Sequence, residues 1–311
     1  MQQPSRYNWK RMPTGGQVHF GMVDDLICIS ECGHRTAMMN SYINFNTNSK
    51  KLQFGVKKCK KLHVGHKLET FKCQDLEVDK WSEIEVQNEE TGEYEMKDIY
   101  EGHHIMEETK DERYLGDIIS TDGKNLKNIR ARISKGKGIV NKIFTMLEGI
   151  PFGKRYFEIG ILLRDSLLIS SMLFNSEAWY NVTDEELNLL ETIDLKFLRK
   201  LLQAPMGTPK EMIYLELGCI PFRKIIRERR LGFLHYIVNE NQDSMIYKFF
   251  QCQNKWKTSK DWVTTVTKDL KLDHLSFEEI MNMKKTHFMN KVKSEIKYLK
   301  SYRKSSFLIQ K

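Results

Sequence analysis

Apolar residues recur at two different spacings along the chain. The spacing changes near residue 120, and this change separates a strand-rich part from a helical part. Up to about residue 120, short stretches alternate apolar and polar side chains, the period-two pattern of strands. Two of these stretches flank residues 22–25, which we expect to form a tight turn. A short helix is predicted over 36–45. The strands predicted on this basis are 18–20, 26–30, 52–56, 84–87, 94–96 and 113–119.

Beyond residue 120 the pattern becomes helical. Three hydroxyl residues are followed three positions later by Glu, the capping-box spacing: Thr183 with Glu186, Thr208 with Glu211, and Ser276 with Glu279. Pro209 is expected at a first helical position, where its missing N–H does no harm. The helix after Asp184 should bury one apolar stripe, formed by Leu187, Leu190, Ile193, Phe197 and Leu201.

Charge is unevenly distributed along the sequence. The 311 residues carry a net charge of +9. The segment Glu69–Arg113 holds 16 acidic and five basic residues, so the remainder is strongly basic. A basic chain with one acidic insert favours polyanion binding by the remainder.

Several protein classes find no support in the sequence. The N-terminal residues lack the apolar stretch of a signal peptide. The best membrane-span candidate, 159–174, is interrupted by Arg164 and Asp165. Six Cys in a chain of this length indicate reduced thiols. No catalytic triad, phosphate-cradling Gly loop or dinucleotide fingerprint is found, and we expect an intracellular protein of the nucleus or cytoplasm.

Two adjacent carboxylates, Asp24 and Asp25, lie at the predicted turn. Neighbouring residues on a flat strand point to opposite faces, so two acids can serve one site only where the chain turns. Apolar strands on either side would leave these acids poorly solvated, and a bound cation would compensate. A solvated surface turn is the simpler interpretation of the dipeptide alone.

The order of motifs around this pair resembles the reverse transcriptases of non-LTR retrotransposons. Met22–Asp25 is followed by a Lys-bearing segment, LQFGVKKCKKLH at 52–63, and then by Tyr114-Leu115-Gly116. The stretches NSEAWYNVTDEELNLLE (175–191) and TPKEMIYLELGCIPFR (208–223) are also typical of this family. The resemblance covers roughly residues 21–270 and begins just before the second carboxylate motif.

The resemblance implies a two-metal polymerase that copies RNA into DNA. Asp24 and Asp25 would hold Mg²⁺, with Asp24 the more direct ligand. Lys58, or alternatively Lys57, would lie near the leaving pyrophosphate as a general acid. Tyr114, Leu115 and Gly116 would form the turn that holds the primer end, and the partners would be an RNA template and a DNA primer.

Two parts of the family pattern are missing from these 311 residues. One is the upstream motif with another metal-binding Asp, and the other is the segment that cradles the incoming nucleotide. Two carboxylates without the third give an incomplete metal site. We therefore expect little or no DNA synthesis by this chain alone.

The clearest basic segment is Lys124–Lys142, which contains seven basic residues and no acid. Leu126, Ile129 and Ile133 are spaced to face a core, and Gly136 and Gly138 are expected to loosen the chain. The resemblance places a thumb here that follows the template–primer backbone. Contacts of this kind are salt-dependent and independent of sequence. The residues expected to make them are Lys124, Lys127, Arg130, Arg132, Lys135 and Lys137.

Two other kinds of site are weakly indicated. Cys28, Cys32 and His34 form one Cys/His group, and Cys59, His63, His66 and Cys73 another, but neither spacing matches a known zinc finger. The aromatic pair Trp179-Tyr180 could stack on nucleobases, although packing in a core is the more common role.

The sequence thus predicts an α+β protein in which a partial polymerase palm of antiparallel strands precedes an all-α bundle. The expected divisions are an irregular segment 1–17, a palm 18–120 with the acidic insert 69–113, thumb-like helices 121–180 and a helical region 181–311. Two alternatives remain open. One is a nucleic-acid-binding protein without catalysis, and the other is a module that binds other proteins.

Overall fold

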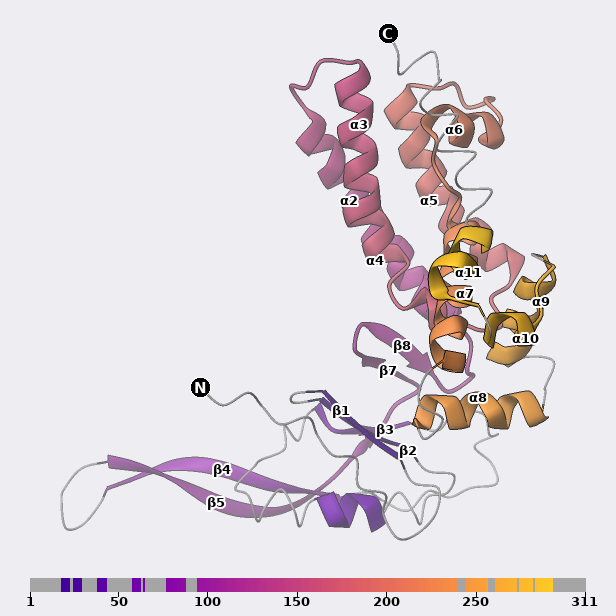
Figure 1. Ribbon diagram of the computed structural model, residues 1–311. Coiled ribbons are helices and arrows are strands. Elements are labelled where there is room, and N and C mark those ends of the chain that lie inside the picture. The colour runs from indigo at the N-terminus through magenta and orange to yellow at the C-terminus, as the bar shows by residue number, and fades with distance from the viewer. Residues whose placement is uncertain are drawn as a thin grey trace, which may run out of the picture. The chain divides into compact units, whose positions relative to one another are not determined.

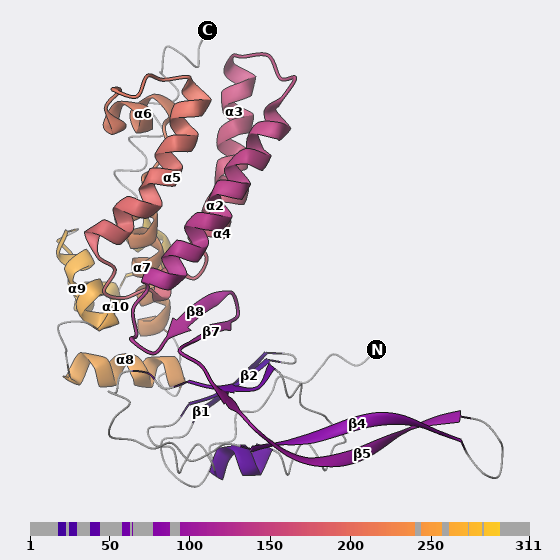
Figure 2. The ribbon, with the colours of Figure 1, turned by 180° about the vertical axis from the view of Figure 1, so that it is seen from behind.

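A computed structural model shows an α+β chain in which short strands precede a helical region (Figures 1 and 2). The structure describes residues 18–22, 25–29, 38–43, 58–62, 64, 77–87, 94–239, 244–256, 261–272, 274–281 and 283–292. The chain divides into two compact units. The first comprises 1–113 and 120–123, and the second comprises 114–119 and 124–311.

Paired strands dominate the described part of the first unit. Strands β1 (Val18–Met22) and β2 (Asp25–Ile29) are antiparallel, with Met22 opposite Asp25. A short helix covers residues 38–43 and buries Met39. The two-residue strands β3 (Lys60–Lys61) and β6 (Glu107–Glu108) pair in parallel. The first hairpin and the helix are as predicted, whereas the strand predicted at 52–56 lies outside the described residues.

The acidic insert contains a long two-stranded ribbon. Strands β4 (Glu77–Gln87) and β5 (Tyr94–Ile105) are antiparallel, so the strands predicted at 84–87 and 94–96 exist and are much longer than the pattern indicated. The register shifts between Lys80, opposite Gly102, and Trp81, opposite Tyr100. Glu101 is therefore an extra residue on β5. Gly102 has φ +105°, a conformation that favours glycine at such a bulge.

The second unit is built from helices after a small hairpin. The hairpin consists of β7 (Asp111–Tyr114), which begins in the first unit, and β8 (Asp117–Ser120). The long helices are α2 (Leu126–Leu147), α5 (Asp184–Leu202) and α7 (Phe222–Asn239). The shorter elements are α3 (Lys154–Leu163), the π-helical segment η2 (Arg164–Ile169), α4 (Ser170–Met172), the 3-10 turn η3 (Ser176–Ala178), α6 (Lys210–Leu217), α8 (Met245–Trp256), α9 (Trp262–Leu272), α10 (Phe277–Met281) and α11 (Lys285–Val292).

Two hydrophobic cores meet along α7. The first joins α2, α3, α5 and α6, which lie side by side in Figures 1 and 2, and it extends to Phe222 and Ile226 at the start of α7. The second begins with Leu231 and Leu234 further along the same helix and continues into α8–α11. The predicted division at 180/181 falls inside the first core, and the two cores meet within one compact unit.

Local signals account for the starts of two helices, α5 and α10. The Thr183 capping box forms as predicted, with the Thr183 N–H donating to Glu186 Oε2 at 2.9 Å and the Glu186 N–H donating to Thr183 Oγ1 at 3.2 Å. The Ser276–Glu279 box forms too. The predicted box at Thr208 is wrong: Pro209 is itself the N-cap of α6, and no side chain caps that helix.

The expected stripe on α5 is the buried face of that helix. Leu190, Ile193, Phe197 and Leu201 are buried, and Leu187 packs at their edge. The prediction for Gly136 is wrong, because α2 continues without interruption through it. A Cβ at Gly136 would lie 2.6 Å from the Met172 sulfur, so this glycine permits the close approach of α4.

Candidate nucleic-acid interface

The predicted polymerase residues of the first unit are described only in part. Val23 and Asp24 lie outside the described residues, and for Asp25 only the backbone at the start of β2 is described. Lys58 is exposed just before β3. The relation of the two carboxylates to Lys58 therefore stays a prediction. Within the described ranges, no group of three or more His, Cys, Asp or Glu side chains could hold a metal ion.

The predicted Cys/His groups are also largely outside the described part. Only Cys59 has a described side chain, which is half-buried. Burial raises the pKa of its thiol, which disfavours the thiolate that zinc would need.

The Tyr114-Leu115-Gly116 segment forms the turn between β7 and β8. Leu115 has φ +47° and Gly116 has φ +90°, and positive values at both central positions define the type I′ family of tight hairpin turns. Glycine adopts this conformation freely, whereas it costs a leucine about 1 kcal/mol. Leu115 is 42% exposed, so no burial of its side chain offsets this cost fully. A strained, exposed apolar residue at a fixed turn is a feature found at functional sites.

Asp117, the residue after this turn, attaches the hairpin to the helices of the second unit. Its Oδ1 accepts from Asn128 Nδ2 at 2.7 Å and from the Arg132 guanidinium, both on α2. Its Oδ2 accepts from Asn175 Nδ2 at 2.5 Å. A carboxylate with three donors on two segments fixes the turn relative to α2, and we call this set of four residues the Asp117 clamp.

Arg132 is buried in the clamp, with only 6% of its surface exposed. Its Nε donates to Asn128 Oδ1 at 3.2 Å, and another nitrogen donates to the Ser171 carbonyl at 3.1 Å. Its guanidinium also lies 5.2 Å from the Trp179 ring centroid and 5.7 Å from that of Phe174. The prediction that Arg132 projects from the helix toward phosphates is therefore wrong, because the carboxylate of Asp117 outcompetes solvent for it.

The other predicted cations of this region lie on a solvent-exposed surface. Lys127, Arg130, Lys135, Lys137 and Lys142 of α2 are all exposed, as is Lys124 just before the helix. The sequence of α2 contains no acid. From Lys127 to Lys142 the helix rises about 22 Å at 1.5 Å per residue. We call these five side chains of α2 the basic face.

The two aromatic residues of the predicted stacking pair differ in exposure. Trp179 is buried, with 3% exposure, and covers Arg132, as the core interpretation expected. Tyr180 is 37% exposed, and its carbonyl accepts from Asn125 Nδ2 at 2.7 Å. Sequence reasoning missed Phe174, which is 50% exposed beside the turn. No periodic pattern marks it, because it lies in a short irregular connection after α4.

A second polar network lies deep in the first core, around Arg164 of η2. Its Nε and a terminal nitrogen donate to the two oxygens of Asp194 at 2.6 and 2.7 Å, and the Ile220 carbonyl accepts at 2.9 Å. The Tyr214 hydroxyl donates to Asp194 at 3.1 Å. Burial lowers the pKa of the guanidinium, but the Asp194 charge outweighs it and keeps the pKa above its usual range. With these groups buried and bonded to one another, the network is a packing device.

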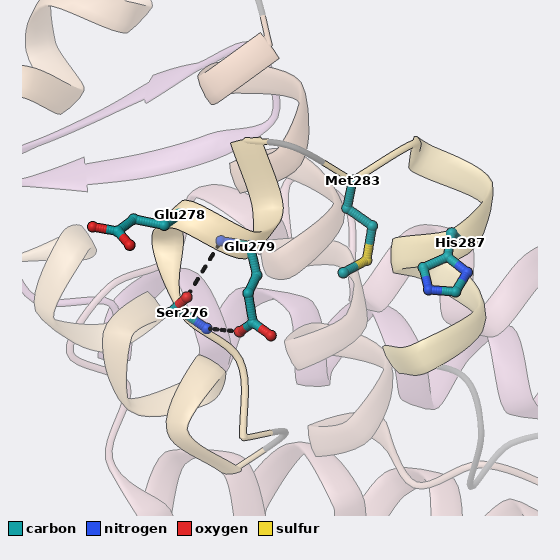
Figure 3. Close-up of a pocket in the computed structure, with 5 residues that line it drawn as sticks. All are labelled: Ser276, Glu278, Glu279, Met283 and His287. Atoms are coloured by element: carbon teal, nitrogen blue, oxygen red, sulfur yellow. Dashed lines mark hydrogen bonds between the residues drawn. The ribbon is translucent and has the colours of Figure 1, made fainter.

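A shallow hollow of about 480 Å³ lies beside α10 (Figure 3). Its lining residues are Ser276, Glu278, Glu279, Met283 and His287. Figure 3 shows that Glu279 and Ser276 bond to each other, in the capping box described above. One of the two carboxylates in this hollow, that of Glu279, is thus already engaged by the helix end.

Comparison with protein-family models, curated proteins and solved structures finds no match to this chain. Among the described helices, none has the length and apolar character needed to cross a bilayer.

Proposed function

We propose that this chain binds the backbone of a nucleic-acid duplex through its second unit, as a part of a non-LTR retrotransposon reverse transcriptase. An RNA template paired with a DNA primer is the proposed ligand. The nucleus and the cytoplasm are the proposed locations.

The observation that carries this proposal is the basic face of α2. Solvated helix surfaces normally mix the two signs of charge, and i,i+4 pairs of opposite sign stabilise them. Here five exposed cations are accompanied by no acid over 22 residues. Arg130, Lys135 and Lys137 make no ion pair with another described residue. Cations kept apart from acids in this way match the regular negative charge of a phosphate backbone.

The clamped turn supports the same proposal. The Asp117 clamp joins the Tyr114–Gly116 turn to the helix that bears the basic face. Because the turn is fixed to α2, it can contact a duplex whose backbone lies along that helix. The family resemblance implies the same arrangement for the turn that holds the primer end.

A binding titration tests the proposal. A fluorescent RNA–DNA hybrid is titrated with the purified chain at several salt concentrations, and fluorescence anisotropy gives Kd. We expect Kd to rise steeply with salt, since each phosphate contact contributes roughly 0.9 to the log–log slope. The variant Arg130→Gln/Lys135→Gln/Lys137→Gln should bind more weakly and lower that slope by about 2–3. Glutamine keeps the helix propensity and removes only the charge.

A matched triple variant controls for net charge. Lys268→Gln/Lys271→Gln/Lys285→Gln removes three exposed cations from α9 and α11 and should leave the slope near that of the unaltered chain. Equal effects of the two triple variants would refute a specific role for α2. A hybrid Kd that does not depend on salt would refute the proposal altogether and favour a protein-binding module.

Catalysis is tested separately, by primer extension with template, primer, dNTPs and Mg²⁺. We propose that the 311-residue chain binds the duplex without extending the primer, because its sequence offers only the Asp24–Asp25 pair of the family's metal ligands. Robust synthesis that Asp24→Asn abolishes would overturn this part of the proposal and leave duplex binding intact.

A further inference from the structure

Phe174 is an exposed aromatic ring held in place from several sides. Half of its surface is accessible to solvent. A Cβ at Gly116 would lie 3.6 Å from the ring, so the glycine of the turn packs against it. The Arg132 guanidinium lies 5.7 Å from the ring centroid on the side of the clamp.

The backbone on both sides of Phe174 is anchored. The preceding carbonyl, of Leu173, accepts a hydrogen bond from Arg229 of α7. The following residue, Asn175, has φ +56° and donates its side-chain N–H to Asp117. Because the segment is fixed, the exposed ring loses little conformational freedom when another flat group stacks on it. The contact is therefore preorganised, and its entropic cost is low.

The charges around the ring are those of a site for an anionic ligand. Arg229 donates to the Leu173 carbonyl of this segment, and the exposed Lys135 lies one turn along α2 from Arg132, whose own charge is compensated by Asp117. The carboxylate of Asp117, which reaches the segment, already accepts from three donors and compensates Arg132, so it adds little net negative charge beside the ring. Nucleic acid combines an aromatic base with a phosphate, whereas an apolar peptide would gain nothing from the cations.

We propose that Phe174 is a base-stacking site, which receives the terminal base of the bound duplex beside the Tyr114–Gly116 turn. This inference rests on the proposed function. It adds that the second unit contacts a nucleobase at the end of the duplex as well as the phosphate backbone. Base–aromatic stacking tolerates any sequence, because every base has a π-face. The Asp117 clamp then acts as a positioning network, since it fixes both the turn and the ring.

The test uses an RNA–DNA hybrid with 2-aminopurine, a fluorescent adenine analogue, at the 3′ end of the primer. Stacking of this base on Phe174 should change its fluorescence when the chain binds, and the same analogue placed in the middle of the duplex should change much less. Phe174→Leu should remove the terminal signal and weaken binding about tenfold, with an unchanged salt slope because no phosphate contact is lost. Phe174→Trp should restore both the signal and the affinity.

Phe152→Leu is the matched control, because Phe152 is 55% exposed in the connection between α2 and α3. It should leave the affinity and the terminal signal unchanged. Salt-dependent binding with no effect of Phe174→Leu on either readout would overturn the stacking site and leave the proposed function standing. Absence of any hybrid binding by the unaltered chain would overturn both. Thermal unfolding of each variant establishes that the helical unit remains folded.

Discussion

Arg164 and Asp194 form an ion pair whose two side chains are almost entirely withdrawn from water, with 2% and 0% exposure. Removing two charges from water costs several kcal/mol per ion, so such a pair adds little net stability and specifies which groups must meet. The pair joins η2 to α5 and, through the Ile220 carbonyl, to the segment before α7. Loss of Arg164 leaves the Asp194 carboxylate buried without a cation, and loss of Asp194 leaves the buried Arg164 with only the exposed carboxylate of Asp165, at 3.0 Å.

This asymmetry predicts that removing both charges costs less stability than removing one of them. Asp194→Leu alone should lower the free energy of unfolding by roughly 3–5 kcal/mol, because Arg164 then stays buried without its carboxylate. Arg164→Met combined with Asp194→Leu should lower it much less, since no charge remains in the core. Urea unfolding of the three proteins measures both values. A double variant less stable than Asp194→Leu alone would contradict this account.

Tyr214 gives the same network a dependence on alkaline pH. Burial, together with the Asp194 charge, raises the pKa of its hydroxyl above the usual value near 10. A group with a raised pKa in the folded state contributes stability below the unfolded-state pKa and loses it as pH rises beyond that point. Tyr214→Phe should therefore cost about 1–3 kcal/mol at pH 7, and this deficit should shrink above about pH 10.

Urea unfolding of this variant at pH 7, 9 and 11 checks the prediction. Tyr236→Phe is the control, because Tyr236 is 48% exposed on α7. Its stability should follow that of the unaltered chain at all three values. A constant deficit for Tyr214→Phe up to pH 11 would show that the hydroxyl titrates normally.

Among the helices and strands, the two threonines with capping-box spacing behave differently. Thr183 caps α5, whereas Thr208 has no bond to the backbone of α6 through its side chain. Its carbonyl accepts from Arg199, and alanine would keep that bond. Thr183→Ala should therefore lower stability by about 0.5–2 kcal/mol, and Thr208→Ala should have almost no effect. Thermal unfolding distinguishes the two variants. Equal losses of stability would mean that the capping box at Thr183 does not stabilise α5.

Local sequence patterns predicted the helices and strands better than they predicted the contacts between these elements. The stripe on α5, the hairpin before Asp25 and two of the three capping boxes follow from short-range rules that act within a few residues. The third capping box, at Thr208, does not form because Pro209 is the N-cap of α6. The length of the β4–β5 ribbon escaped prediction because its apolar alternation is diluted by charged residues.

Contacts between distant residues explain what the sequence could not reveal about the candidate site. The family resemblance implied the turn at Leu115-Gly116, and the exposed cations of α2 were predicted. The single strand predicted over 113–119 is wrong, because the positive φ of Leu115 and Gly116 divides it into β7 and β8. Arg132 was misassigned because its partner, Asp117, lies 15 residues away, and a list of basic residues does not show which of them meets a carboxylate. Phe174 was missed because it lies in the short connection after α4, where no periodic pattern marks an exposed ring.

For the whole molecule, the boundary between the two units matters. The sequence placed it at 120/121, after the last strand, whereas the structure assigns 114–119 to the helical unit. The reason is chemical: the carboxylate of Asp117 is bonded to α2 and to Asn175. The turn therefore belongs to the unit that bears the basic face.

A pair of fragments tests this assignment. A fragment of residues 106–311 keeps Asp117, and one of residues 121–311 loses it and leaves Arg132 without its carboxylate. The shorter fragment should be less stable by roughly 3–5 kcal/mol in urea unfolding. Adding Arg132→Met to the shorter fragment should recover part of this loss, because no uncompensated charge then remains. Equal stability of the two fragments would place the boundary where the sequence put it.

The absence of acids from α2 has a consequence for how salt acts on this protein. Lys127 and Arg130 lie one turn apart near the N-terminal end of the helix, where the backbone dipole is also positive, so the unliganded helix carries internal repulsion. Dissolved ions screen that repulsion and should favour folding, yet the same ions compete for a bound duplex. Higher ionic strength should thus raise the Tm of the free protein and weaken the complex. A bound polyanion should slow amide exchange along α2, because it relieves the repulsion directly.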